Sequence, residues 1–212
     1  AQRDSTFEGG ALDPVQEDEA GAALTVLDLT LRNGFSSEDG GAIENRGHTI
    51  VRRSWLEGNR IQYPWAGRHG GGAIYNAGML EIYDSAFESN SVSIGDSGGA
   101  FGGALFNAGT LTVRDTLFRS NGVSTDDVTG IGAALFNIGT ASIARASVLE
   151  SRGDGNGVAI RNDGNGVLTL ANITVAKSMG LEYESDAAVA NGSDYPMYAG
   201  TPSMTLVHAT IA

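Results

Sequence analysis

The chain contains no cysteine, only four prolines among 212 residues, and no apolar run long enough to cross a bilayer. The absence of cysteine excludes disulfides, thiol catalysis and cysteine-based metal sites. Basic residues are scarce as well, because 13 lysines and arginines face 25 aspartates and glutamates, for a net charge of −12. Nucleic acids and anionic membranes both require a basic surface, so neither is an expected partner, and membrane insertion is not expected.

The sequence also lacks two further signals. No window holds a helical period over a dozen residues, so helices are expected to be minor. No stretch resembles a signal peptide, yet the polar residues AQRDST at the N-terminus suit a chain from which such a peptide has been removed. We therefore expect an extracellular or cell-surface location.

Glycine, in contrast, is abundant, with 31 residues, and much of it belongs to a repeated phrase. The phrase reads GGAIEN at 40–45, GGAIYN at 71–76, GGALFN at 102–107, GAALFN at 132–137 and GVAIRN at 157–162, and a degenerate copy, AAVAN, ends at 191. Its asparagines are Asn45, Asn76, Asn107, Asn137, Asn162 and Asn191, at spacings of 31, 31, 30, 25 and 29 residues. A regular period of this length indicates a repeat architecture.

A second phrase follows each copy of the first. It reads TIVRRSWLEGN at 49–59, LEIYDSAFESN at 80–90, LTVRDTLFRSN at 111–121, ASIARASVLES at 141–151 and LTLANITVAKS at 168–178, and residues 24–33 and 204–212 fit the same template. Apolar residues alternate with polar ones and many are β-branched, which predicts short strands separated by polar corners.

One such repeat is too short to bury its own apolar side, whereas stacked repeats bury a continuous core. We therefore expect an all-β fold, a single parallel β-helix of about seven coils over residues 24–212. Residues 1–23 would form an N-terminal segment or a partial first coil. The repeated asparagines are expected to form a ladder of side-chain hydrogen bonds at one corner. The glycines two positions later, Gly47, Gly78, Gly109, Gly139 and Gly164, are expected to supply the positive φ of that corner.

The pairing of GGA[I/L]xN with FxxN, at Phe87–Asn90 and Phe118–Asn121, resembles the repeats of the polymorphic outer-membrane protein family. The resemblance covers about residues 24–212. It implies a right-handed parallel β-helix and a place on the bacterial cell surface.

An aromatic column is the first candidate site. Strand alternation places one residue of each phrase outward, and the column reads Glu44, Tyr75, Phe106, Phe136 and Arg161. Three stacked aromatic rings between a glutamate and an arginine predict an exposed binding or assembly face. The alternative is that the stacked rings only stabilise the sheet.

A charged column is the second candidate. It contains Arg53, Asp84, Asp115, Arg145, Asn172 and His208, one residue per coil. Asp84 and Asp115 are weak candidates for a calcium site or an acid/base pair. The alternative is an exposed polar corner with stacked ion pairs and no chemistry. No cofactor other than this calcium ion is expected.

No catalytic residues can be assigned from the sequence. His48, His69 and His208 lie far apart and lack metal-ligand spacing, and the first two are expected in loops or corners. The chain ends within a strand phrase, so a continuing chain or a neighbouring molecule is expected to cover that end.

These observations predict a non-enzymatic surface protein, a rigid rod for adhesion, display or head-to-tail filament assembly, with a protein partner or self-association. The alternative is a lyase, epimerase or hydrolase of acidic polysaccharides, or a carbohydrate-binding module.

Overall fold

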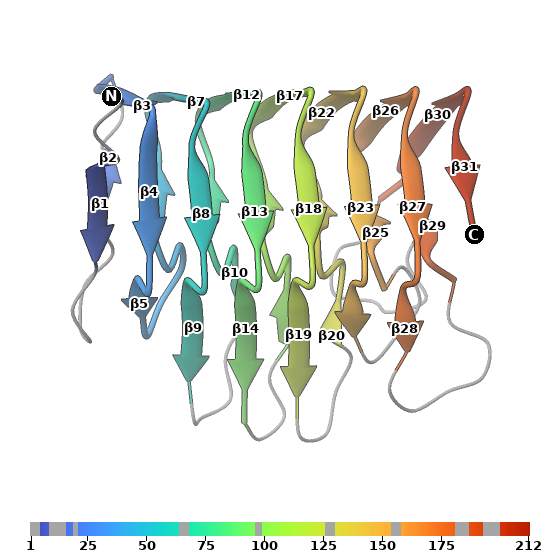
Figure 1. Cartoon of the computed structure of the whole chain (residues 1–212). Coiled ribbons are helices and arrows are strands. Elements are labelled where there is room, and N and C mark those ends of the chain that lie inside the picture. The colour runs from blue at the N-terminus through green and yellow to red at the C-terminus, as the bar shows by residue number, and fades with distance from the viewer. Residues whose placement is uncertain are drawn as a thin grey trace.

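The computed structural model describes residues 5–8, 16–18, 21–63, 68–95, 99–125, 130–153, 158–180, 187–192 and 200–212. This part of the chain contains strands and turns, and no helix in it is long and apolar enough to span a membrane. The strands stack along one axis as a parallel β-solenoid, with the first strand at one end and the last at the other (Figure 1). The expected all-β fold is therefore confirmed.

One coil passes through five sheets in turn. It consists of β6 (Ile43–Asn45), β7 (His48–Arg52), β8 (Trp55–Glu57), β9 (Arg60–Tyr63) and β10 (Arg68–Gly70). The next strand, β11 (Ile74–Asn76), then pairs in parallel with β6. Front strands run downward in Figure 1 while the chain advances from left to right, so the solenoid is right-handed.

The front sheet is the longest, with eight strands. It contains β1 (Ser5–Glu8), β4 (Leu29–Arg32), β8, β13 (Ala86–Glu88), β18 (Leu117–Arg119), β23 (Ser147–Leu149), β27 (Thr174–Ala176) and β31 (Thr210–Ile211). The top sheet has seven strands: β3 (Ala23–Leu27), β7, β12 (Met79–Tyr83), β17 (Thr110–Arg114), β22 (Thr140–Ala144), β26 (Val167–Ala171) and β30 (Ser203–Val207). Each predicted strand phrase is thus one top strand, a corner and one front strand.

Three further sheets complete the coils. The back sheet contains β2 (Gln16–Asp18), β6, β11, β16 (Leu105–Asn107), β21 (Leu135–Asn137), β25 (Ile160–Asn162) and β29 (Val189–Asn191). The lower sheet contains β5 (Phe35–Ser36), β9, β14 (Ser91–Ile94), β19 (Gly122–Thr125), β24 (Arg152–Gly153) and β28 (Met179–Gly180). The cover sheet contains only β10, β15 (Gly99–Phe101) and β20 (Gly130–Ile131). The number of stacked strands therefore varies with the sheet, and the expected seven coils are an approximate count.

The N-terminal segment contributes strands to the same stack. β1 pairs with β4 and β2 pairs with β6, both in parallel. Residues 1–4, 9–15 and 19–20 lie outside the described part of the chain.

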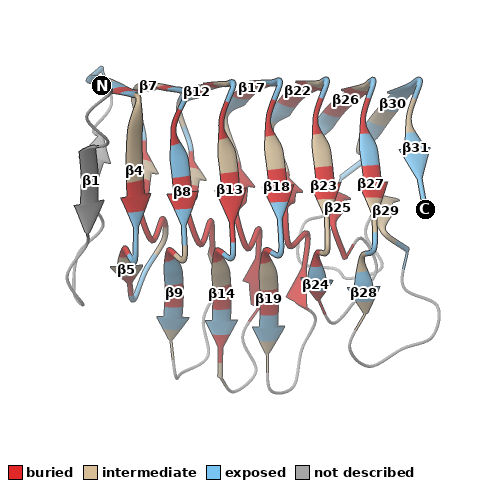
Figure 2. Cartoon of the chain, viewed as in Figure 1, coloured by how far each residue is buried: buried red, intermediate tan, exposed pale blue. Residues whose placement is uncertain are grey.

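Inward side chains form a core that runs the length of the solenoid. One buried apolar cluster extends from Val26 to Val175 and draws residues from the front, top and back sheets (Figure 2). Phe87 and Phe118 lie at its centre, with ring centroids 5.1 Å apart. Because strand side chains alternate, each coil contributes the same inward positions to this core.

The predicted asparagine ladder closes the back sheet. Each Nδ2 donates to Oδ1 of the asparagine in the next coil, at 2.6 Å from Asn45 to Asn76, from Asn76 to Asn107 and from Asn107 to Asn137. The ladder continues at 2.7 Å through Asn162 to Asn191. These bonds satisfy buried amides that would otherwise be costly.

A second, shorter ladder lies between the front and lower sheets. Asn59 donates to Asn90 at 2.9 Å, and Asn90 donates to Asn121 at 3.1 Å. The ladder ends where Ser151 occupies the equivalent position, and the buried hydroxyl of Ser151 has no hydrogen-bond partner. The last asparagine of each FxxN motif therefore has a structural role.

The glycines after the asparagines have a different role from the one expected. Among Gly47, Gly78, Gly109, Gly139 and Gly164, only Gly164 has a positive φ. A Cβ on Gly78 would lie 2.1 Å from the carbonyl oxygen of Gly47, so the close approach of stacked backbones requires glycine there. Positive φ occurs instead at the first glycine of the phrase, for example at Gly71 (75°) and Gly102 (60°).

Candidate functional site

The aromatic column is not an exposed face, which corrects the expectation from the sequence. Phe106 is 6% exposed and Phe136 is 0% exposed, because Phe101 and Ile131 of the cover sheet lie over them. The Phe101 and Phe136 ring centroids are 4.7 Å apart. Tyr75 is half-buried and stacks on Phe106 at 5.2 Å. The column is thus a second apolar core between two sheets, and Phe106 and Phe136 are not available to a partner.

The two charged residues expected at the ends of this column are also engaged. Glu44 forms an ion pair with Arg46. Arg161 is buried, and its Nε lies 3.4 Å from a carboxylate oxygen of the equally buried Asp163. Neither charge therefore borders an open apolar patch.

The charged column lies where expected, at the corner between the top and front sheets. Every member has a left-handed backbone, with φ of 45° at Arg53, 50° at Asp84 and 51° at Asp115. The corner also includes Asp28, with φ of 53°, which the sequence reading omitted. Residues 24–33 fit the repeat template, so Asp28 could have been found by aligning that segment with the others.

Ion pairs connect neighbouring coils along this corner. Arg53 contacts both carboxylate oxygens of Asp28 at 2.7 Å. Arg145 contacts both carboxylate oxygens of Asp115 at 2.7 and 2.6 Å. These hydrogen bonds hold the pKa of Asp28 and the pKa of Asp115 below the ordinary aspartate value. Asp84 lies between the two pairs, and its closest cation is Arg52 at 3.9 Å.

A shallow groove runs along this corner and onto the front sheet. Its volume is about 800 Å³. The lining residues are Asp28, Leu29, Thr30, Arg53, Ser54, Trp55, Asp84, Ser85, Ala86, Asp115 and Leu117. We call it the front groove, and we call the outward surface of the front sheet the front face. The structure therefore brings Asp84 and Asp115 together with an aromatic residue in one concave surface.

Trp55 is the residue of this groove that the sequence analysis missed. It is 43% exposed and lies in register with Thr30 on one side and Ala86 on the other. Its place in WLEGN, three residues before the glycine, matches Ala86 in AFESN and Leu117 in LFRSN. The signal was therefore present as a large aromatic residue at an outward position of the repeat.

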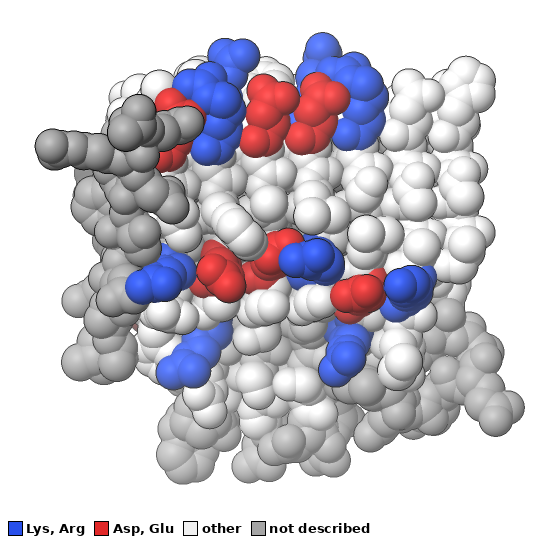
Figure 3. Space-filling model, viewed as in Figure 1, with Lys and Arg blue, Asp and Glu red and all other residues white. Residues whose placement is uncertain are grey.

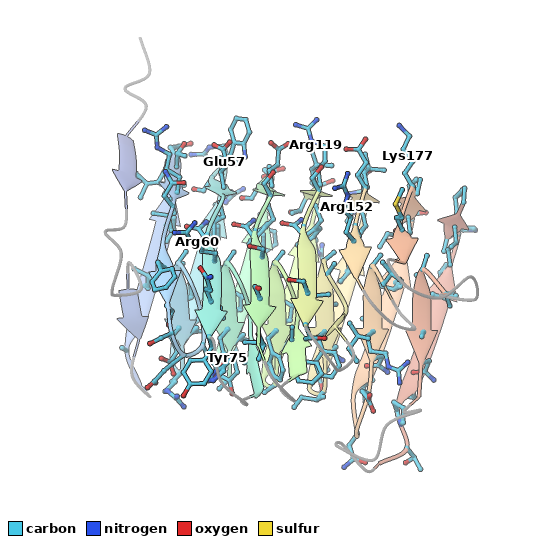
Figure 4. The ribbon with its side chains drawn as sticks, turned by 90° about the horizontal axis from the view of Figure 1, so that it is seen from below. Glu57, Arg60, Tyr75, Arg119, Arg152 and Lys177 are labelled. Atoms are coloured by element: carbon cyan, nitrogen blue, oxygen red, sulfur yellow. The ribbon has the colours of Figure 1, made fainter. Side chains whose placement is uncertain are left out.

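A second row of charges borders the front face on its lower side. Arg32, Glu57, Glu88 and Arg119 are in register on neighbouring strands, and Glu88 pairs with Arg119 at 2.6 Å. The two rows run parallel along the rod, with the outward residues of the front sheet between them (Figure 3). Glu57, Arg119 and Lys177 lie on the opposite side of the rod from Tyr75 (Figure 4).

The histidines do not share a site. His48 begins β7 and is not in a loop, and its Nε2 lies 2.8 Å from Glu81 Oε1. Tyr83 donates to the other oxygen of Glu81, and these two hydrogen bonds lower the pKa of Glu81. His69 lies within β10, also a strand, beside the ring of Tyr63 at 4.9 Å.

Among the described residues, no group of three or more histidine, aspartate or glutamate side chains could hold a metal ion. Comparison of the chain with protein-family models, with curated proteins and with solved structures gives no match.

Proposed function

We propose that this chain is a non-enzymatic, extracellular structural protein that presents the front face of a rigid β-helix to a partner, in adhesion or display. The observation that carries the proposal is the front groove, about 800 Å³ in volume, on a sheet of eight stacked strands. Binding sites are typically concave and preformed, and a solenoid offers an extended surface of fixed shape. The likeness of the repeats to polymorphic outer-membrane proteins supports a bacterial cell-surface location.

The internal hydrogen bonds support a rigid scaffold. Five side-chain bonds join six asparagines along the back sheet, and the shorter ladder joins three more beside the lower sheet. Each bond fixes one coil relative to the next without restricting the outer surface. Outward side chains are therefore held at the spacing of the strands, about 4.8 Å per coil.

The enzyme alternative has less support. Asp84 and Asp115 line the front groove, as a polysaccharide lyase, epimerase or hydrolase would need. However, the bidentate contact with Arg145 lowers the pKa of Asp115, so its carboxyl group is a poor proton donor near neutral pH. Binding of a ligand without turnover fits this arrangement better.

The test compares binding with cleavage on the same material. Immobilised neutral and acidic polysaccharides, and immobilised acidic and basic proteins, are each incubated with the chain, with and without Ca²⁺. We expect retention on at least one surface, loss of retention in a Leu117→Asp variant, and no new reducing ends. New reducing ends or unsaturated sugars that disappear in Asp84→Asn would overturn the proposal.

A further inference from the structure

Two buried serine hydroxyls stand at the position where the shorter asparagine ladder would continue. Ser151 and Ser178 follow Asn121 at that position in the next two coils, because the residues that come directly after them are in register. Ser151 is 0% exposed, and among the described residues neither serine oxygen has a hydrogen-bond partner in the protein. A buried hydroxyl without a partner is costly. These two oxygens therefore indicate that a further group lies beside them.

In the coils with asparagine, the carboxamide bonds to two backbone groups of the preceding coil. Its Oδ1 accepts from a backbone N–H, at 3.0 Å from Asn59 to Asn90 and at 3.0 Å from Asn90 to Asn121. Its Nδ2 donates to a backbone carbonyl oxygen, at 2.9 Å from Asn90 to Leu56 and at 2.9 Å from Asn121 to Phe87. Each asparagine thus supplies the preceding coil with both an acceptor and a donor.

The serines do not supply these bonds. The N–H of Asn121 and the carbonyl of Phe118 hold the positions that the N–H of Asn90 and the carbonyl of Phe87 hold one coil earlier. The Ser151 hydroxyl bonds to neither of them, since it has no partner among the described residues. A donor, an acceptor and a hydroxyl therefore surround the position that a carboxamide occupies in the other coils.

The backbones do not close in around the smaller side chain. The N–H of Arg152 donates to the carbonyl oxygen of Asn121 at 3.1 Å, and the equivalent bond from Gly122 to Asn90, in a coil with asparagine, is 2.9 Å long. The coils therefore keep their spacing where serine replaces asparagine. A hydroxyl has two fewer non-hydrogen atoms than a carboxamide, and the difference leaves room for about one water molecule.

We propose that a buried water molecule takes the place of the missing carboxamide at Ser151. It accepts a hydrogen bond from the N–H of Asn121, donates one to the carbonyl oxygen of Phe118 and bonds to Oγ of Ser151. A second water at Ser178 bonds in the same way to the N–H of Ser151 and to the carbonyl oxygen of Val148, the register partner of Phe118. Two water molecules thus continue the shorter ladder through the coils that lack asparagine. This inference is independent of the proposed function.

Water is the occupant that fits this set of groups. Each position presents a donor, an acceptor and a hydroxyl, and a buried water molecule typically makes about three hydrogen bonds. A metal cation would be repelled by the N–H group, and an anion would be repelled by the carbonyl oxygen. Empty cavities in proteins are lined by apolar groups, whereas these positions are lined by polar ones.

The experiment combines a high-resolution crystal structure of the full chain with magnetic relaxation dispersion of the solvent, which counts long-lived internal water molecules in solution. We expect one density peak within hydrogen-bond distance of Ser151 Oγ, the Asn121 nitrogen and the Phe118 carbonyl oxygen. In Ser151→Asn the carboxamide takes this position, so the peak should be lost and the count of long-lived water molecules should fall by one.

Two control variants separate this site from other effects of the exchange. Asn121→Ser ends the shorter ladder one coil earlier, so it should add one long-lived water molecule at position 121. Ser142→Asn makes the same exchange as Ser151→Asn on the exposed side of the top sheet, so it should leave the count unchanged. Circular dichroism should show that all variants keep the fold.

The absence of density beside a well-ordered Ser151, or equal counts of long-lived water molecules in the parent chain and in Ser151→Asn, would overturn the proposal. If Ser151→Asn does not fold, Ser151→Val gives a second test, because its methyl groups displace the water and leave the N–H of Asn121 and the carbonyl of Phe118 unpaired. Ser151→Val should therefore lower the urea midpoint, whereas a raised midpoint would show that the position is dry in the parent chain.

Discussion

Replacement of Asn107 by alanine tests how much the asparagine ladder stabilises the solenoid. Asn107 is fully buried, accepts a hydrogen bond from Asn76 at 2.6 Å and donates one to Asn137 at 2.6 Å. Each lost bond costs about 1 kcal/mol net, and a buried oxygen of Asn137 left without this donor adds about 1–3 kcal/mol. We expect Asn107→Ala to lower the free energy of unfolding by about 3 kcal/mol.

Asn191→Ala is the matched control, because it removes the same side chain from the exposed end of the same ladder. Asn191 accepts from Asn162 at 2.7 Å, but Asn162 also donates to the carbonyl oxygens of Gly166 and Ser203. Water can replace the hydrogen bond that the Asn191 side chain makes, so the expected cost in free energy of unfolding is below about 1 kcal/mol.

Urea unfolding followed by circular dichroism measures both variants. With a slope of about 2 kcal/mol per molar urea, Asn107→Ala should lower the midpoint by about 1.5 M and Asn191→Ala by less than about 0.5 M. The slope must be the same for the variants and the parent chain, because repeat proteins can also unfold one coil at a time, and a changed slope would indicate such behaviour. Equal shifts of the urea midpoint in the two variants would refute the argument that buried bonds of the ladder stabilise the fold more than exposed ones.

Three further predictions concern other parts of the solenoid. Ser151→Asn should extend the shorter ladder from Asn121 and raise the urea midpoint, because the buried Ser151 hydroxyl has no partner at present; a lowered midpoint would show that the site has no room for the amide. Phe106→Ser should cost at least about 3 kcal/mol of stability in the same assay, because the ring is buried beneath the cover sheet; an unchanged midpoint would show that the ring is exposed in solution. Folding lowers the pKa of Asp115, so this carboxylate adds stability above the unfolded aspartate pKa of about 3.9, and that contribution is lost as the pH falls through the lower folded pKa. Arg145→Gln should therefore flatten the acid side of the stability curve measured between about pH 5 and pH 2, whereas an unchanged curve would show that the pair does not persist in solution.

The candidate sites were predictable only in part. The charged corner was correctly placed, because the repeat fixes which residue follows each top strand, and the left-handed backbone at Asp84 and Asp115 keeps both side chains outside the core. The front groove was not predicted, because Trp55 had to be compared with Thr30 and Ala86, its register partners on the two neighbouring coils. Its exposure depends on the size of these neighbours and not on its own strand.

The sequence by itself determined the solenoid, since alternating apolar residues and a period of about 30 residues can bury a continuous core only by stacking. It also determined the asparagine ladder, because an asparagine at the same position of every coil lies next to the equivalent asparagine of the following coil. Only the tertiary structure decided which outward residues reach solvent. Phe106 and Phe136 alternate as exposed residues would, yet Phe101 and Ile131 cover them. The covering strands lie outside the repeated phrases, so their contact with the aromatic column depends on how the intervening segments fold back, which periodicity does not encode.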